Sequence, residues 1–161
     1  MTLLKMLTSE AVCNTTPNSY SSPCVRLVNK GAAVSTVILK ENPRAIALTI
    51  NASANGTTLI TLGSGTTSTL KAGNILVNSS NVQVINTDAN SVITAIVNTT
   101  AFTTNVDIII ANGVSTVYAV DSIKTLSILP NTELLIDKKS IDWIESNNAA
   151  NVLCIGVSYR G

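Results

Sequence analysis

The sequence predicts an all-β fold: an antiparallel β-sandwich of jelly-roll or immunoglobulin type, with an inserted β subdomain as one alternative for the middle section. The composition is the first observation, because 21 threonines, 18 asparagines and 17 serines stand beside 17 isoleucines and 16 valines in 161 residues. These are the residues of strands and turns. Second, no run of a dozen residues carries the apolar period of an amphipathic helix. We therefore expect helix in under about a tenth of the chain, confined to its first few residues.

Short β-branched runs follow one another along the chain, each bounded by Asn, Gly, Ser or Asp. Val25–Val28 and Val34–Leu39, joined by an Asn/Gly turn, predict a hairpin, and Pro130-Asn131 predicts a tight turn. The other predicted strands are 45–50, 58–62, 75–77, 82–85, 92–97, 106–110, 116–120, 125–129, 133–136, 141–145 and 152–159. Their length and spacing are typical of a sandwich or a barrel.

The side-chain pattern predicts which face of the last strand is buried. Leu153, Ile155, Val157 and Tyr159 alternate with Val152, Cys154 and Gly156. Because the first set is the larger and more apolar, we expect it to line the core. In residues 141–145 the alternation fails, which predicts a turn or a bulge there.

Charge is distributed unevenly along the chain. From Ala45 to Val106 the charged residues are Lys71 and Asp88, whereas the flanks carry the other seventeen. This shift predicts an N-terminal arm over residues 1–23, a sandwich built from residues 24–49 and 105–161, and a β-rich insert or sheet extension over residues 50–104. The alternative is that the middle section forms the apolar side of one continuous sandwich.

Composition disfavours several function classes. Ten Lys and Arg against nine Asp and Glu leave no basic field for nucleic acid. The absence of histidine removes Ser-His-Asp and Cys-His catalysis and His-ligated metals. We expect no enzymatic activity, no catalytic residue, no cofactor and no metal site. The longest apolar runs, such as Ile108–Ala111, are too short to cross a membrane, and Met1–Glu10 lacks the pattern of a signal peptide.

Few residues suggest catalysis or metal binding. The clustered acids are Asp121, Glu133, Asp137, Asp142 and Glu145. Paired carboxylates can hydrolyse a glycosidic bond or bind calcium, but these alternate with lysines and fall at turns. We therefore expect them to be solvated surface charges.

Glycines, cysteines and the single tryptophan also have ordinary structural interpretations. Gly63, Gly65 and Gly73 match no phosphate-binding motif, so we expect turn glycines. Cys13 and Cys24 could close a short disulfide loop, but the odd Cys154 favours reduced thiols, with Cys154 buried. Trp143 is expected to anchor a core or an interface.

The C-terminal third resembles a known group of proteins. The segments that carry the resemblance are Thr116–Ile123, with its tyrosine strand, Leu126–Leu135, with Leu-Pro-Asn-Thr at a turn, and Ser140–Tyr159, which closes on Val-Ser-Tyr. Cys24–Gly31 matches the opening hairpin of the same group. This pattern resembles small virion structural proteins of tailed phages, most like those of marine cyanophages.

The resemblance implies a β-sandwich that decorates or cements a capsid, with no catalytic residue. It implies the major capsid protein or another virion protein as partner, and a homo-oligomer, either a trimer or a dimer. The protein would then be found at the capsid surface after assembly in the host cytoplasm, with no nucleic acid and no membrane as partner. The alternative is a receptor- or glycan-binding module of a phage fibre, or a neck or tail accessory protein. A carboxylate-only polysaccharide hydrolase is least favoured.

The first residues are the candidate partner-binding site. Leu3, Leu4, Met6 and Leu7 are too few to build a core alone, and they precede a stretch rich in Asn, Thr, Pro and Ser. Such an arm is typical of a docking segment. The alternative is that the arm adds an edge strand to its own sandwich.

Overall fold

The computed structural model describes residues 4–7, 9–13, 15, 18–50, 57–78, 91–108 and 113–159. Within these ranges the chain is nearly all β, with antiparallel sheets and a single 3-10 turn at Thr67–Thr69. The predicted all-β antiparallel fold is therefore confirmed. The expectation of helix in the first few residues is wrong, because Leu4–Met6 is a strand that pairs with the end of the chain. Leu3 and the predicted strand 82–85 lie outside the described residues.

The chain forms two compact units. We call Met1–Asn42 with Ile123–Gly161 the sandwich unit, and Pro43–Ser122 the barrel unit. The barrel unit is wider than the predicted insert at 50–104, so strands 45–50 and 116–120, which we had placed in the sandwich, belong to the barrel. The charge pattern misplaced the boundary because it reports surface chemistry, whereas a strand belongs to the unit in which its backbone is paired.

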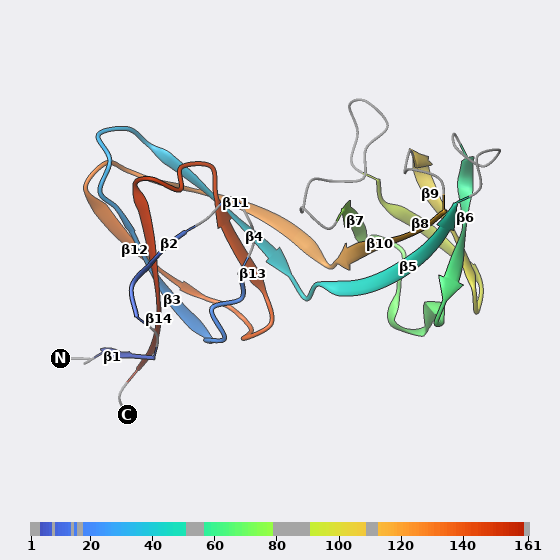
Figure 1. Cartoon of the computed structure of the whole chain (residues 1–161), viewed down its shortest axis with the longest axis horizontal. Helices are drawn as coiled ribbons and strands as arrows, with labels where there is room; N and C mark the ends of the chain where they lie inside the picture. Colours follow the sequence, from blue (N-terminus) through green and yellow to red (C-terminus); the bar gives the residue numbers. More distant parts are fainter. Residues whose placement is uncertain are drawn as a thin grey trace. The chain divides into compact units, whose positions relative to one another are not determined.

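The sandwich unit contains two antiparallel sheets. In the first, β14 pairs on one side with β1 and β2 and on the other with β3, which pairs in turn with β12 (Figure 1). In the second, β4 lies between β11 and β13. The strands are β1 Leu4–Met6, β2 Ala11–Val12, β3 Cys24–Asn29, β4 Ser35–Glu41, β11 Ser122–Ile128, β12 Thr132–Asp137, β13 Trp143–Ser146 and β14 Val152–Tyr159.

Alternating side chains of both sheets form the sandwich core. Val25 and Leu27 of β3 lie in one buried cluster with Val37 and Leu39 of β4. The rest of this cluster is Cys13, Tyr20, Ile128, Ile136, Ile144, Val152 and Cys154. Full burial of a Val, Leu or Ile side chain stabilises by about 1.5–3 kcal/mol, so this two-sided core is the main source of the unit's stability.

The predicted hairpin between residues 25–28 and 34–39 is wrong, because β3 and β4 belong to different sheets. The cause is Asn29, whose side chain is buried rather than at the tip of a turn. Its amide donates to the carbonyl oxygens of Ala33 at 2.8 Å and Ile128 at 3.0 Å, and its Oδ1 accepts from Gly31 N at 2.9 Å. These bonds hold a loop that carries the chain across to the facing sheet.

The prediction for the last strand is confirmed only in part, because Ile155 and Val157 are buried but the main sandwich core is lined by the other face; the side chain of Tyr159 lies outside the described part. Val152 and Cys154 line the sandwich core, whereas Ile155 and Val157 lie on the opposite face of β14 and pack against Cys24. All of them are buried, because both faces of this central strand are covered. Apolarity alone cannot identify the core face of a strand that is buried on both sides.

The barrel unit is one six-stranded antiparallel sheet in the order β7-β10-β5-β6-β9-β8 (Figure 1). The strands are β5 Arg44–Ile50, β6 Thr57–Ser64, β7 Ile75–Asn78, β8 Ile93–Asn98, β9 Ala101–Ile108 and β10 Gly113–Val120. Its two end strands meet, because Ile75 bridges to Val92 and Ile93 N donates to Asn74 O at 2.8 Å. The sheet therefore curls back on itself into a small barrel.

The inward side chains of the six strands form the barrel's own core. Phe102 of β9 is fully buried at its centre, with Leu48 of β5 and Leu76 of β7. The remaining members are Ile46, Ile60, Leu62, Leu70, Ile93, Ile108, Val117 and Ala119. A separate core explains why this low-charge section is a unit of its own and not one side of a continuous sandwich.

The predicted turns at Asn131, Gly65 and Gly73 are confirmed, whereas Gly63, also predicted as a turn glycine, lies inside β6. Asn131 follows Pro130 with a φ of 54°, a left-handed conformation that asparagine tolerates better than most residues. Gly65 and Gly73 have φ values of 81° and 93°, which only glycine adopts readily. Ile141 lies in a turn just before β13, which accounts for the broken alternation in residues 141–145.

Candidate functional site

The N-terminal arm is built into the sandwich unit. Leu4–Met6 pairs with Val157–Tyr159, and Ala11–Val12 pairs with Leu153 and Cys154, so β1 and β2 form one interrupted edge strand along β14. Asn18 also exchanges two backbone hydrogen bonds with Ile144 of the second sheet, at 2.9 and 3.0 Å. The alternative in which the arm extends its own sandwich is therefore the one that the structure contains, and the separation of residues 1–23 as an arm is wrong.

Several apolar side chains of the arm nevertheless remain exposed. Met6 is 61%, Leu7 46% and Val12 43% exposed. Met6 lies in register with Val157 and Val12 with Leu153, so both stand on the face of the first sheet that points away from the sandwich core. The backbone of Leu4 is described, but its side chain, like the whole of Leu3, is outside the described part. We call Met6, Leu7 and Val12 the arm face.

An ion pair lies on the first sheet as well, on the strands β3 and β12, which are farthest from the arm. Arg26 of β3 and Glu133 of β12 form an ion pair in which Arg26 Nε donates to Glu133 Oε2 at 2.9 Å. Leu135, which pairs with Arg26, is also exposed. The arm also carries a charge of its own, because Glu10, two residues before Val12, forms an exposed ion pair with Lys30 at 3.1 Å. The apolar side chains of the arm face are thus bordered by charged groups.

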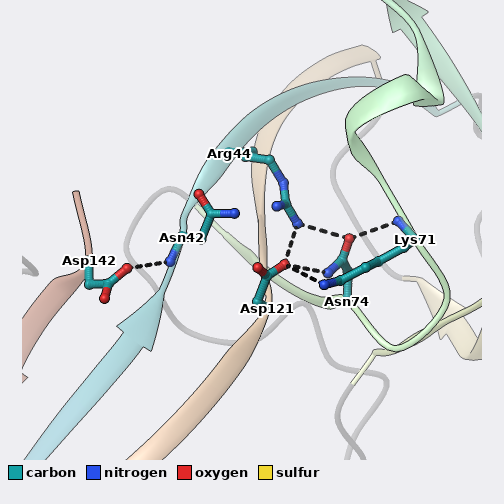
Figure 2. Close-up of polar contacts among 6 residues, drawn as sticks. All are labelled: Asn42, Arg44, Lys71, Asn74, Asp121 and Asp142. Atoms are coloured by element: carbon teal, nitrogen blue, oxygen red, sulfur yellow. Dashed lines mark hydrogen bonds and ion pairs between the residues drawn. The ribbon is translucent and has the colours of Figure 1, made fainter. Parts of the chain in front are cut away.

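The clustered acids do not share one environment, which corrects the expectation that all are solvated. Glu133 and Asp137 are exposed, as expected. Asp142 is buried and holds a turn, since its Oδ1 accepts from Asn42 N at 2.7 Å (Figure 2). Its Oδ2 accepts from Lys139 N at 2.8 Å. Carboxylates that accept backbone N–H groups in this way stabilise loops, so Asp142 is a structural residue.

Lys40 and Glu145 form a buried ion pair that the sequence did not reveal. Lys40 on β4 is 2% exposed and Glu145 on β13 is 9% exposed, and Lys40 Nζ lies 2.9 Å from Glu145 Oε1. Burial lowers the pKa of Lys40 below its usual value, and the hydrogen bond that Lys40 donates to the Glu145 carboxylate opposes that shift. The only signal in the sequence was a lysine at the end of the apolar run 34–39, where the pairing partner cannot be identified.

Another polar cluster lies in the barrel unit, where β5 begins and β10 ends (Figure 2). Arg44 Nη2 at the start of β5 donates to Asp121 Oδ1 at 2.8 Å and to Asn74 Oδ1 at 2.9 Å. Asn74 Nδ2 donates to the same Asp121 oxygen at 2.9 Å, and Lys71 Nζ lies 3.7 Å from it. The arginine, asparagine and aspartate thus tie the end of β10 and the turn before β7 to β5. Arg44 Nε is buried without a hydrogen-bond partner, but Arg44 Nη2, Asn74 and Lys71 all contact the Asp121 carboxylate. The cluster therefore closes the barrel end and presents no free carboxylate.

The cysteines are reduced in this structure and all three are buried. Cys13 does not face Cys24, as the disulfide alternative required, but shares a hydrogen bond with Cys154, with Tyr20 also in contact. That hydrogen bond and burial raise the pKa of Cys154, whereas the bond lowers the pKa of Cys13. Burial raises the pKa of Tyr20. Shielded thiols of this kind behave as small core residues.

The barrel unit also has a shallow groove beside Gly65. It has a volume of about 310 Å³ and is lined by strands β5, β6 and β10 and by hydroxyl residues that include Ser64, Thr66, Thr69 and Thr116. A Cβ atom added at Gly65 would meet nothing within 4 Å, so the glycine serves its turn and not the approach of a ligand. The groove has neither a charge nor an aromatic ring with which to orient a ligand.

Among the described residues, no group of three or more potential His, Cys, Asp or Glu ligands could hold a metal ion. No described helix is long and apolar enough to span a membrane. Comparisons with protein-family models, curated proteins and solved structures find no match to this chain. The arm face is therefore the candidate site. Met6 and Leu7 were predicted from the sequence as partner-binding residues, and the structure places both at the surface.

Proposed function

We propose that this protein is a non-enzymatic structural protein of a phage particle that binds the head shell as a decoration or cement protein. The observation that carries the proposal is the arm face: Met6 and Val12 are exposed on the paired strands β1 and β2, and the exposed Leu7 follows β1 directly. The resemblance of residues 24–40 and 106–159 to virion structural proteins supports the same function.

The geometry of the arm favours a docking role for the arm face. Because β1 and β2 are already paired with β14, Met6 and Val12 are held in place before any partner arrives. A preformed surface binds without the entropic cost of ordering a free segment. Exposed apolar groups close together are the usual core of a protein interface, and the Arg26–Glu133 pair provides a polar rim.

Quantitative mass spectrometry of purified phage particles tests the function. We expect the protein in the particles at a copy number that is a symmetric multiple of the head lattice. A copy number of a few per particle would instead support a fibre, neck or tail part. Absence from purified particles would refute the proposal.

Substitution tests the arm face. Met6→Asp and Leu7→Asp together place two carboxylates on it and are expected to abolish binding to particles that lack the protein. Val34→Asp is the matched control, since Val34 is 54% exposed in a loop of the same unit but is not on the arm face. Equal binding by the double variant and the control would contradict docking through this face.

A further inference from the structure

The barrel unit has an exposed apolar surface of its own on β6, β9 and β8. Leu59 of β6 is 52% exposed and Val97 of β8 is 53% exposed, and Ile96 beside it is also exposed. The register places Leu59 and Ala95 on either side of Thr103 in β9. We call Leu59, Ala95, Val97 and Thr103 the barrel face.

Moving this surface out of water costs little free energy of desolvation. Residues 57–70 and 91–106, which include β6, β8 and most of β9, contain no charged side chain. The hydroxyls of Thr94 and Thr103 lie 2.8 Å apart and hydrogen-bond to each other. Burying an unpaired polar group or charge is costly, but the hydroxyls of Thr94 and Thr103 are already paired with each other.

Three end strands of the sandwich unit differ in this respect, whereas β7, at the other end of the barrel sheet, is as uncharged as β8. The sandwich unit has Lys5 on β1, Lys124 on β11, and Glu133 and Asp137 on β12. Charges on such strands are the usual means by which β-proteins avoid pairing with copies of themselves. β8 combines exposed β-branched residues with no charge, so that protection is missing.

We propose that the barrel face binds a second copy of this chain and forms a symmetric dimer. The neutrality of the surface is the reason for this partner: a charged partner surface would be desolvated against β8 without a counter-charge, whereas a second copy brings an equally neutral, apolar surface with no like-charge repulsion. A two-fold interface brings Leu59 and Val97 of each copy against the same surface of the other. The proposal does not depend on the virion function, and it concerns a different unit from the arm face.

Sedimentation equilibrium of the full chain tests it, at concentrations up to about 0.2 mM so that weak dimers are detected. We expect a reversible dimer. Val97→Lys and Leu59→Lys each place two lysines at a symmetric interface and are expected to raise the dissociation constant at least tenfold, roughly the effect of losing one good contact. Val34→Lys, in the sandwich unit, is the control and should leave the dimer unchanged.

A wild-type chain that is monomeric throughout this range would overturn the proposal. So would a dimer that tolerates both barrel substitutions but dissociates with Met6→Asp, because association would then run through the arm face. Hydrogen exchange of the wild type gives a check without any variant: the amides of residues 94–97 should gain protection as concentration rises. Unchanged exchange there would also count against the barrel face.

Discussion

The buried Lys40–Glu145 pair should make the sandwich unit sensitive to the loss of either partner. Glu145→Leu removes the carboxylate 2.9 Å from Lys40 Nζ and leaves an ammonium group that is 2% exposed. Breaking one side of a buried ion pair typically costs about 3–5 kcal/mol. Replacing both with apolar residues is often neutral or stabilising, so Lys40→Met with Glu145→Leu should be at least as stable as the wild type.

The pKa of Lys40 gives this prediction a pH signature. Burial already lowers that pKa below the usual 10.5, and removing Glu145 takes away the group that opposes the shift. Between the lowered folded-state pKa and 10.5 the unfolded chain binds more protons than the folded chain, so the free energy of unfolding rises with pH. In Glu145→Leu this rise is expected to approach about 1.4 kcal/mol per pH unit. It should disappear in the double variant, which has no ammonium group.

Urea unfolding followed by tryptophan fluorescence measures the effect in the right unit. Trp143 is the only tryptophan and lies on β13, directly opposite Lys40 in the strand register, so its emission reports the sandwich unit. The linear dependence on urea gives the free energy of unfolding for each variant.

Lys124→Met is the matched control, because it breaks the exposed ion pair between Lys124 and Glu41 in the same unit. Exposed pairs contribute only about 0.2–1 kcal/mol, so its effect should be small. If Glu145→Leu costs no more than Lys124→Met, or if its cost does not change with pH, then Lys40 is solvated and the argument is wrong.

Three further predictions concern the cores and one turn. Phe102→Ala empties the centre of the barrel core and should cost about 3–5 kcal/mol in the calorimetric transition of that unit, while an equal shift of the Trp143 transition would show that the two units unfold together. Asn131→Val should cost about 1–2 kcal/mol in urea unfolding, because a β-branched residue fits poorly at a φ of 54°, whereas Asn131→Gly should be tolerated; equal effects would argue against the left-handed turn. The three buried cysteines should resist an aromatic disulfide reagent in the native protein and react fully in denaturant, and rapid native reaction would contradict their burial.

The candidate site could be predicted only in part. Met6 and Leu7 were identified from apolarity near the chain end, and both are exposed. Val12 was missed because its exposure depends on pairing with Leu153 across the sheet. Lys40 and Glu145, 105 positions apart in the chain, could not be matched, because a β-sheet brings together residues whose separation in sequence carries no signal. Leu59 and Ala95 on the barrel face are neighbours for the same reason.

The class of fold and the position of most strands follow from local sequence. β-branched runs, turn residues and the absence of a helical period are local properties, and they act within a few residues. The turn at Asn131 and the glycines at 65 and 73 were predictable on the same ground, since each backbone conformation depends on its own residue.

Strand pairing and the choice of buried face, in contrast, depend on contacts between distant parts of the chain. Val25–Val28 and Val34–Leu39 have the local pattern of a hairpin, but the buried Asn29 side chain bonds to Ile128 and sends the chain to the facing sheet. β14 is covered on both faces, so its larger side chains do not mark the main core. The division at Pro43 and Ser122 likewise follows from the closure of the barrel. Pairing and burial are long-range interactions, whose free energy depends on partners that local sequence does not specify.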